Sequence, residues 1–194
     1  MNQRIDFKEK IEQKIDLLNR LQEESYESQI LEVIHTLVKV LQKGGTVFFC
    51  GNGGSMSDAA HIAAELSGRF YINRPPLKAI CLATNTSYLT AVANDLNYED
   101  IFARELQALS NKGDVLVALS TSGNSLNVIN AMQVANAKDL IGVSITGDFI
   151  SELGKLSDVN IKIPSTDTPR IQETYMFVLH YICEKVEELM FKNS

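Results

Sequence analysis

The stretch VFFCGNGGSMSDAAHIAAEL, residues 47–66, decides the fold. An apolar run stops at a glycine-rich turn, and a helical pattern of small and apolar residues follows that turn at once. A buried strand that leads through a short loop into a helix is the repeating unit of a parallel α/β sheet. The stretch therefore predicts a first strand, a loop at its carboxyl end, and a helix that packs back on the sheet.

The same alternation of strand and helix continues through the chain. Short apolar runs typical of strands buried on both faces lie at 46–50, 78–83, 114–119, 140–145 and 159–163. Helical patterns separate them at about 55–68, 86–109, 125–137 and 150–156, and a last helix covers roughly 168–191. We expect an α/β fold, a doubly wound five-stranded parallel sheet flanked by helices, with flavodoxin-like topology.

The residues before the first strand form an N-terminal extension. Two amphipathic helices are expected between Ile5 and Lys43, and Gly44 with Gly45 ends the pair. The whole chain, 1–194, is expected to be a single domain, with 1–44 as its helical extension. The apolar faces of the two helices either cover one side of the sheet or pack on the last helix or another subunit, and both alternatives stay open.

Composition excludes several classes of protein. A formal charge of −6 and a pI near 5.1 argue against a nucleic-acid-binding surface. The three cysteines are far apart in apolar contexts without a CxxC pair, which is typical of reduced core thiols and not of a thiolate zinc site. No apolar run approaches the ~18 residues of a membrane span, and the polar start MNQRIDFKEK does not resemble a signal peptide. We expect a soluble, cytoplasmic protein.

Two loops of the expected sheet are rich in small polar residues. Gly51–Ser55 (GNGGS) follows the first strand, and Ser120–Ser125 (STSGNS) follows the third. Glycines let the backbone approach a ligand, and N–H groups at the start of a helix favour phosphate. Neither loop has Walker A or dinucleotide-fingerprint spacing, so no nucleotide cofactor is expected. Each loop alone could be an ordinary turn and helix cap, but the two together favour a phosphorylated small molecule.

Two pairs of polar side chains border these loops. His61 and Glu65 stand four residues apart on the helix after the first loop, so they point the same way. Gln172 and His180 lie a little over two turns apart on the last helix. An ordinary helix-surface contact and a satisfied core histidine remain alternatives. The residues alone indicate a phosphosugar-binding α/β domain with candidate acid–base groups.

Four segments carry a family resemblance, CGNGGS…DAAHIAAEL, ANDLNYEDIFARE, GDVLVALSTSGNS and IPSTDTPRIQE…LH. From about residue 30 to the C-terminus they resemble the sugar-isomerase (SIS) domain family and, within it, the phosphoheptose isomerases. The resemblance implies an aldose–ketose isomerase that interconverts D-sedoheptulose 7-phosphate and D-glycero-D-manno-heptose 7-phosphate through an enediol. That reaction would be the first step of ADP-heptose or GDP-heptose precursor synthesis, for lipopolysaccharide core or for capsule.

The resemblance also implies roles for single residues. Glu65 matches the catalytic base and His180 its acid–base partner. One zinc ion per subunit would be held by His61, Glu65, Gln172 and His180. The implied substrate-binding residues are Asn52, Gly53, Ser55, Glu65, Arg69, Asn94, Asp95, Ser120, Thr121, Ser122, Ser125 and Gln172. Pro169 stands where some members have an acidic residue, which puts any role for a side chain there in doubt.

The resemblance implies a homotetramer in which Gln172 and His180 face the Glu65 helix of a neighbouring chain. Two other functions are alternatives to an enzyme. One is a non-catalytic SIS protein that binds the bacterial replication initiator, and the other is a regulatory SIS domain that senses phosphosugars. The presence of Glu65 together with His180 favours the enzyme, because neither alternative needs this pair.

Overall fold

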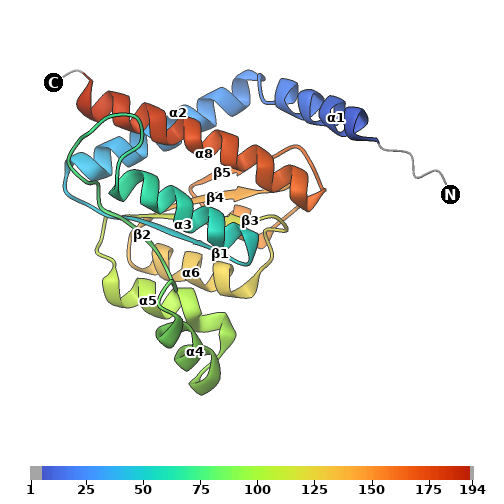
Figure 1. Cartoon of the computed structure of the whole chain (residues 1–194). Coiled ribbons are helices and arrows are strands. Elements are labelled where there is room, and N and C mark those ends of the chain that lie inside the picture. Colours follow the sequence, from blue (N-terminus) through green and yellow to red (C-terminus); the bar gives the residue numbers. More distant parts are fainter. Residues whose placement is uncertain (1–5, 193–194) are drawn as a thin grey trace.

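The computed structural model describes residues 6–192, and its centre is a sheet of five parallel strands (Figure 1). The strands are β1 (Val47–Gly51), β2 (Ala79–Cys81), β3 (Val115–Ser120), β4 (Ile141–Thr146) and β5 (Val159–Lys162). They are ordered β2-β1-β3-β4-β5, with Val47 in register with both Ala79 and Val115. This order confirms the flavodoxin-like doubly wound sheet, and its direction of winding reverses between β1 and β3.

The helices agree with the sequence prediction in all but one region. Their bounds are α1 (Phe7–Arg20), α2 (Glu24–Gln42), α3 (Gly54–Ser67), α4 (Thr86–Asp95), η1 (Tyr98–Asp100), α5 (Ile101–Leu109), α6 (Leu126–Ala137), α7 (Glu152–Leu156) and α8 (Thr168–Phe191). The prediction of one helix over 86–109 is wrong, because the structure divides it into α4, η1 and α5. The backbone leaves the helical region at Leu96 and is extended at Asn97. Asparagine and aspartate favour turns, and this segment contains three of them at 94, 95 and 97.

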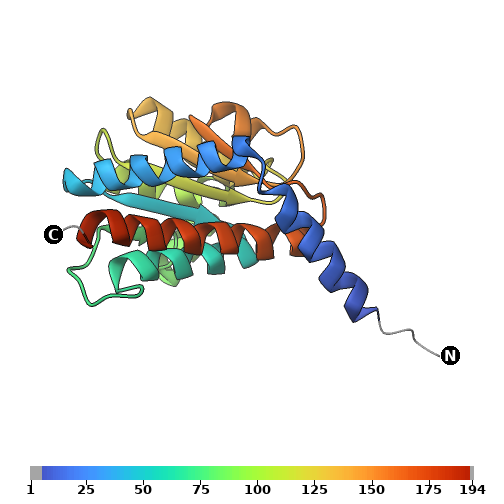
Figure 2. The ribbon, with the colours of Figure 1, turned by 90° about the horizontal axis from the view of Figure 1, so that it is seen from above.

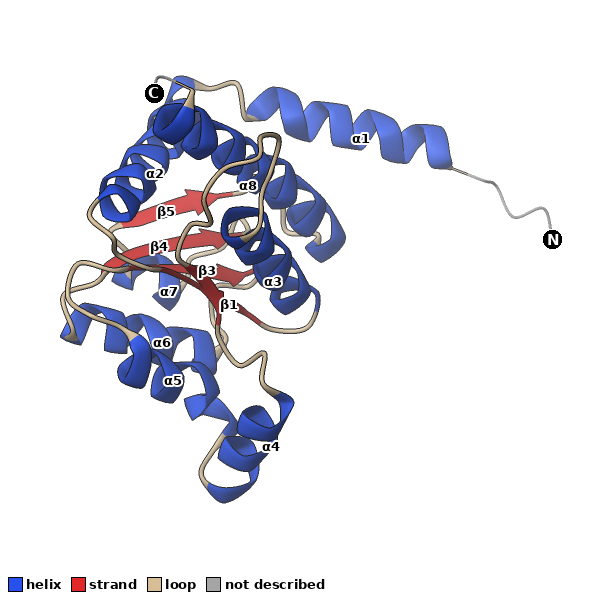
Figure 3. Ribbon diagram, turned by 60° about the vertical axis from the view of Figure 1, so that its left-hand side comes forward, coloured by secondary structure: helices blue, strands red, loops and turns tan. Residues whose placement is uncertain are grey.

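Helices cover both faces of the sheet (Figure 3). α2, α3 and α8 lie on one face, and α5, α6 and α7 lie on the other. Side chains alternate along a strand, so neighbouring residues of β1 serve different layers. Phe49 packs with Leu37 and Leu179 on the first face, and Phe48 packs with Phe102 and Met132 on the second. Two apolar cores therefore hold the central strands, as expected for strands buried on both faces.

The two helices of the N-terminal extension behave differently. α2 buries Val33, Ile34 and Leu37 against the sheet and α8, so the alternative of covering one side of the sheet is right for this helix. α1 projects away from the body (Figures 1 and 2) and exposes Phe7 and Ile15. The expected helix start at Ile5 lies outside the described residues.

The three cysteines are expected to be reduced thiols in the core. Cys50, Cys81 and Cys183 are all buried as free thiols, which confirms them as core residues. Burial, with a smaller effect of the Glu105 carboxylate, raises the pKa of Cys81 to about 11. Protonated buried thiols are poor nucleophiles, so these residues serve packing. Separately, no helix within residues 6–192 combines the length and apolarity needed to cross a membrane.

Candidate active site

The two polar loops meet at the carboxyl edge of the sheet. β1 and β3 are adjacent strands, and α3 and α6 begin directly after the loops that follow them. Gly53 caps α3 with φ 57° and ψ −121°, a backbone conformation that only glycine adopts readily. The N–H groups at the starts of both helices are therefore at the switch point of the sheet, where ligands bind in open α/β folds.

A pair of asparagines joins the first loop to the start of α6. The Asn52 side-chain amide donates to Oδ1 of Asn127 at 2.8 Å, and the Asn127 amide donates back to Oδ1 of Asn52 at 2.8 Å. The Tyr98 hydroxyl also donates to Oδ1 of Asn52 at 3.0 Å. Sequence reasoning found Asn52 but missed Asn127 and Tyr98, because these residues come from segments that only the folded chain brings together.

The hydroxyl residues predicted to bind phosphate lie along this edge. Ser55 and Ser120 are each 4% exposed. Oγ of Ser120 lies 3.4 Å from Oγ of Ser125 and accepts the backbone N–H of Gly123 at 3.1 Å. Thr121 is half-buried and Ser122 is exposed. Because β1 and β3 are adjacent, the structure thus brings all five predicted hydroxyl residues to the same edge of the sheet.

A buried tyrosine supports the first loop from α8. The Tyr175 hydroxyl lies 2.6 Å from Oδ2 of Asp58 and 3.0 Å from Oγ of Ser55. A phenol has one proton and a carboxylate only accepts, so Tyr175 donates to Asp58. Burial raises the pKa of Tyr175, and the hydrogen bond to Asp58 raises this pKa further, which keeps the phenol protonated. No spacing in the sequence signals this contact, because α3 and α8 are more than a hundred residues apart.

Gln172 also belongs to this end of α8. A Cβ at Gly54 would lie 2.6 Å from Nε2 of Gln172, so glycine leaves room for this side chain beside the loop. Gln172 precedes His180 by eight residues, which is about 12 Å along the helix axis. The structure places the Gln172 side chain beside Gly54 of the first loop, and its place in the expected set of four zinc ligands stays a prediction.

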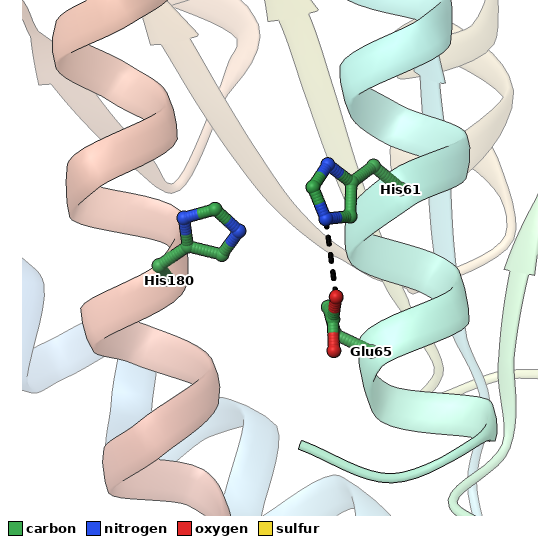
Figure 4. A group of neighbouring side chains, drawn as sticks. All are labelled: His61, Glu65 and His180. Atoms are coloured by element: carbon green, nitrogen blue, oxygen red, sulfur yellow. Dashed lines mark hydrogen bonds and ion pairs between the residues drawn. The ribbon is translucent and has the colours of Figure 1, made fainter. Parts of the chain in front are cut away.

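The other three expected metal ligands come together between α3 and α8 (Figure 4). Nε2 of His61 lies 3.1 Å from Oε1 of Glu65, and the ring centroids of His61 and His180 are 5.1 Å apart. One donor atom from each residue lies within 4.8 Å of the others. Two imidazoles and one carboxylate are a donor set that suits Zn²⁺. The site is solvent-accessible, since the His61 side chain is 49% exposed and that of Glu65 is 25% exposed.

This cluster corrects one expectation about assembly. We expected His180 to face the Glu65 helix of a neighbouring chain. In the structure both residues belong to one chain, because α3 and α8 pack side by side on the same face of the sheet. A site that contains both residues therefore does not require a second subunit.

The remaining predicted site residues lie outside both clusters. Arg69 is exposed just beyond α3. Asn94 and Asp95 are exposed at the end of α4, where the Asn94 amide donates to Oδ1 of Asp95 at 2.7 Å. Pro169 is exposed in the first turn of α8, a position that proline favours because its missing N–H has no partner there. Pro169 thus has a structural role at the start of this helix.

Comparison with known proteins finds the same family by family model, by sequence and by structure. Residues 10–147 match the family model described as SIS domain. The phosphoheptose isomerase of Helicobacter pylori (strain P12) is 46% identical over 164 residues, which cover 84% of this chain and 85% of the relative. That of Shewanella sp. (strain ANA-3) is 45% identical over 191 residues, 97% of this chain and 94% of the relative. The structure of a phosphoheptose isomerase from Neisseria gonorrhoeae aligns with a TM-score of 0.83 at 34% identity, covering 94% of this chain and 95% of that one.

Replacement of the buried phenol tests the support beneath the first loop. We expect Tyr175→Phe to lower the free energy of unfolding by about 1–3 kcal/mol, because the half-buried Asp58 carboxylate loses its hydrogen-bond donor. Urea denaturation followed by circular dichroism measures the change. Tyr71→Phe is the matched control, because Tyr71 is 67% exposed, and it should leave stability unchanged. Equal stability of the two variants would show that the Tyr175 hydroxyl has no supporting role.

Proposed function

The chain belongs to the phosphoheptose isomerases, a family of SIS-domain proteins, and from this premise we propose that it interconverts D-sedoheptulose 7-phosphate and D-glycero-D-manno-heptose 7-phosphate. The observation that carries the proposal is the cluster of His61, Glu65 and His180 beside two loops of phosphate-binding character. The substrate is inferred from membership of the family, and the cluster contains the acid–base groups that the reaction needs.

The reaction moves a proton between two adjacent carbons through an enediol, so it needs a base for carbon and an acid for oxygen. Glu65 takes the proton from the carbon next to the carbonyl. His61 contacts Oε1 of this carboxylate, and this contact orients the side chain toward the space between α3 and α8. His180 approaches from α8 and exchanges protons with the substrate oxygens. Glu65 thus transfers the proton on carbon, and His180 transfers the protons on oxygen.

The spacing along α3 agrees with a seven-carbon substrate. Ser55 and His61 are about 9 Å apart along the helix axis, and the Glu65 side chain points back toward the level of His61. An extended heptose phosphate spans roughly 10 Å from phosphorus to C1, at about 1.3 Å for each single bond. With its phosphate at the two loops, the sugar places C1 and C2 beside Glu65.

The alternatives to an enzyme explain less of the structure. A regulatory phosphosugar sensor needs the two loops but has no use for a carboxylate held against two imidazoles. A protein that only binds the replication initiator needs neither feature. The partly exposed cluster favours catalysis, since it presents a carboxylate and two imidazoles together at a solvent-accessible position between α3 and α8.

Removal of the base tests the proposed function directly. We expect Glu65→Gln to lower kcat by roughly 10²–10⁴-fold, because the amide keeps the shape but accepts no proton. KM should stay near the wild-type value, because the phosphate loops are unchanged. An assay of sedoheptulose 7-phosphate turnover measures both, with Glu152→Gln, an exposed glutamate of α7, as control. Substantial turnover by Glu65→Gln would exclude Glu65 as the base.

We also propose that His61, Glu65 and His180 hold a Zn²⁺ ion. The mixed nitrogen and oxygen donors within 4.8 Å of one another support this proposal. When bound, zinc would act as a Lewis acid that polarises the substrate carbonyl. The resemblance implies Gln172 as a fourth ligand, and the proposal from geometry covers the three residues whose donor atoms lie together.

Titration of metal-free protein with Zn²⁺ tests the proposed ligands. Calorimetry should show one site per chain, and His61→Ala should weaken its affinity by tenfold or more because one of three protein ligands is lost. His35→Ala is the control, since His35 is exposed on α2. Equal affinity of the His61→Ala variant and the wild-type protein would contradict the site.

We propose a homotetramer in the cytoplasm, working at the start of nucleotide-heptose synthesis. Exposed apolar side chains support the assembly, because Phe7, Ile11 and Ile15 are 70%, 45% and 52% exposed along one stripe of α1. Phe177 and Tyr181 of α8 are exposed as well, at 59% and 40%. Three free buried thiols agree with a reducing compartment.

Mixed oligomers test whether each chain builds its own site. Chains with Glu65→Gln and chains with His180→Ala should be co-expressed and purified as mixed assemblies, with stoichiometry checked by mass spectrometry. Because both residues come from one chain, every site in the mixture lacks one of them. We expect no more activity than the two variants give separately. Recovery toward a quarter of wild-type activity would mean that the site is shared between chains.

A further inference from the structure

A buried ion pair links the segments that carry the proposed active site. Nε of Arg74 lies 2.9 Å from Oε1 of Glu187, and their side chains are 1% and 3% exposed. In every other ion pair among residues 6–192, both side chains are at least 25% exposed. Arg74 lies between α3 and β2, and Glu187 follows His180 by two turns on α8.

Arg74 closes the C-terminal end of α3. Its Nη2 donates to the backbone carbonyl of Glu65 at 2.9 Å, and its Nη1 donates to that of Leu66 at 2.8 Å. The last carbonyls of a helix have no partner within the helix and carry partial negative charge. The guanidinium satisfies two of them and thereby fixes the turn from which the Glu65 side chain extends.

Glu187 holds the segment that follows α3. Its carboxylate accepts three consecutive backbone N–H groups, those of Phe70, Tyr71 and Ile72, at 2.8–3.1 Å. Burial alone would raise the pKa of Glu187, but these N–H groups and Arg74 outweigh it and lower the pKa below its ordinary value. The Phe70 ring in this segment stacks on His180, with centroids 6.0 Å apart and an interplanar angle of 21°.

The pair therefore acts on both sides of the cluster. Arg74 fixes the backbone of Glu65, and Glu187 fixes the loop that holds Phe70 against His180. Buried ion pairs contribute little net stability compared with apolar residues of the same volume, so stability alone does not account for this arrangement. A rigid link between the two helices does account for it, since catalysis is sensitive to displacements of about 1 Å.

We propose that Arg74 and Glu187 are positioning residues that set the placement of Glu65 and His180 relative to one another. Phe70 transmits the effect of Glu187 to the His180 ring. This inference rests on the proposed isomerase function for its kinetic consequence, but its geometric consequence at His180 does not depend on that function.

The variant Glu187→Gln tests the proposal, with Asp114→Asn as a matched control. Asp114 is also a buried carboxylate, 4% exposed, whose two oxygens accept the backbone N–H groups of Thr46 and Asn111. It directly precedes β3, at the opposite end of that strand from the Ser120–Ser125 loop, and its partners Thr46 and Asn111 lie outside α3 and α8. We expect Glu187→Gln to lower kcat by about tenfold or more with KM within about twofold, and Asp114→Asn to leave both unchanged, below the unfolding temperature of each.

A second measurement follows the His180 ring itself. Proton NMR resolves the three histidines, which His35→Gln and His61→Gln assign. The His180 ring signal should shift in Glu187→Gln, because Phe70 no longer stacks as before, and stay fixed in Asp114→Asn. If Glu187→Gln does not fold, Phe70→Leu takes its place and should also lower kcat.

Two results would overturn the proposal. One is a folded Glu187→Gln protein with wild-type kcat and an unmoved His180 signal. The other is an equal loss of kcat in Asp114→Asn, which would reveal a general effect of destabilisation. Failure of the wild-type chain to convert the sugar phosphate would contradict the proposed function instead, while the NMR shift would still decide the role of Glu187.

Discussion

The packing of α3 against α8 is the constraint on which the site depends. The two helices run side by side in the same direction on one face of the sheet, and contacts recur along their length (Figure 1). Tyr175 meets Ser55 and Asp58 near the start of α3, and His180 meets His61 farther along. The proposed phosphate end and reacting end of the substrate are thus fixed by a single pair of helices.

The two ends of the proposed site use different kinds of chemical group. The proposed phosphate end consists of helix N-termini and hydroxyl groups, which can bind an anion without a charged side chain in a chain with a net charge of −6. The proposed reacting end consists of a carboxylate and two imidazoles, groups that are suited to proton transfer and to metal binding. The distance between the two proposed ends follows from the rise of α3, so under the proposed function helix geometry limits the length of the sugar.

The sequence predicts the parts of this site that depend on local pattern. Five strands, the two loops and the pairing of His61 with Glu65 follow from hydrophobic periodicity, glycine spacing and the i, i+4 relation. Contacts between distant segments have no such pattern. The pairs Tyr175 with Asp58, Asn52 with Asn127 and Glu187 with Arg74 appear only when the sheet is assembled. For the same reason, His180 could not be assigned from sequence to its own chain, and the break at Leu96 was hidden in a helical pattern.

Solvent exchange during turnover tests the central claim most directly, which is that the site between α3 and α8 isomerises the sugar by proton transfer through an enediol. The protein should be incubated with sedoheptulose 7-phosphate in D₂O and the products followed by NMR. An enediol formed by the Glu65 carboxylate predicts deuterium at C2 of the aldose, and at C1 of the recovered ketose. Product without deuterium would indicate direct hydrogen transfer between the carbons, and absence of product would contradict the isomerase itself.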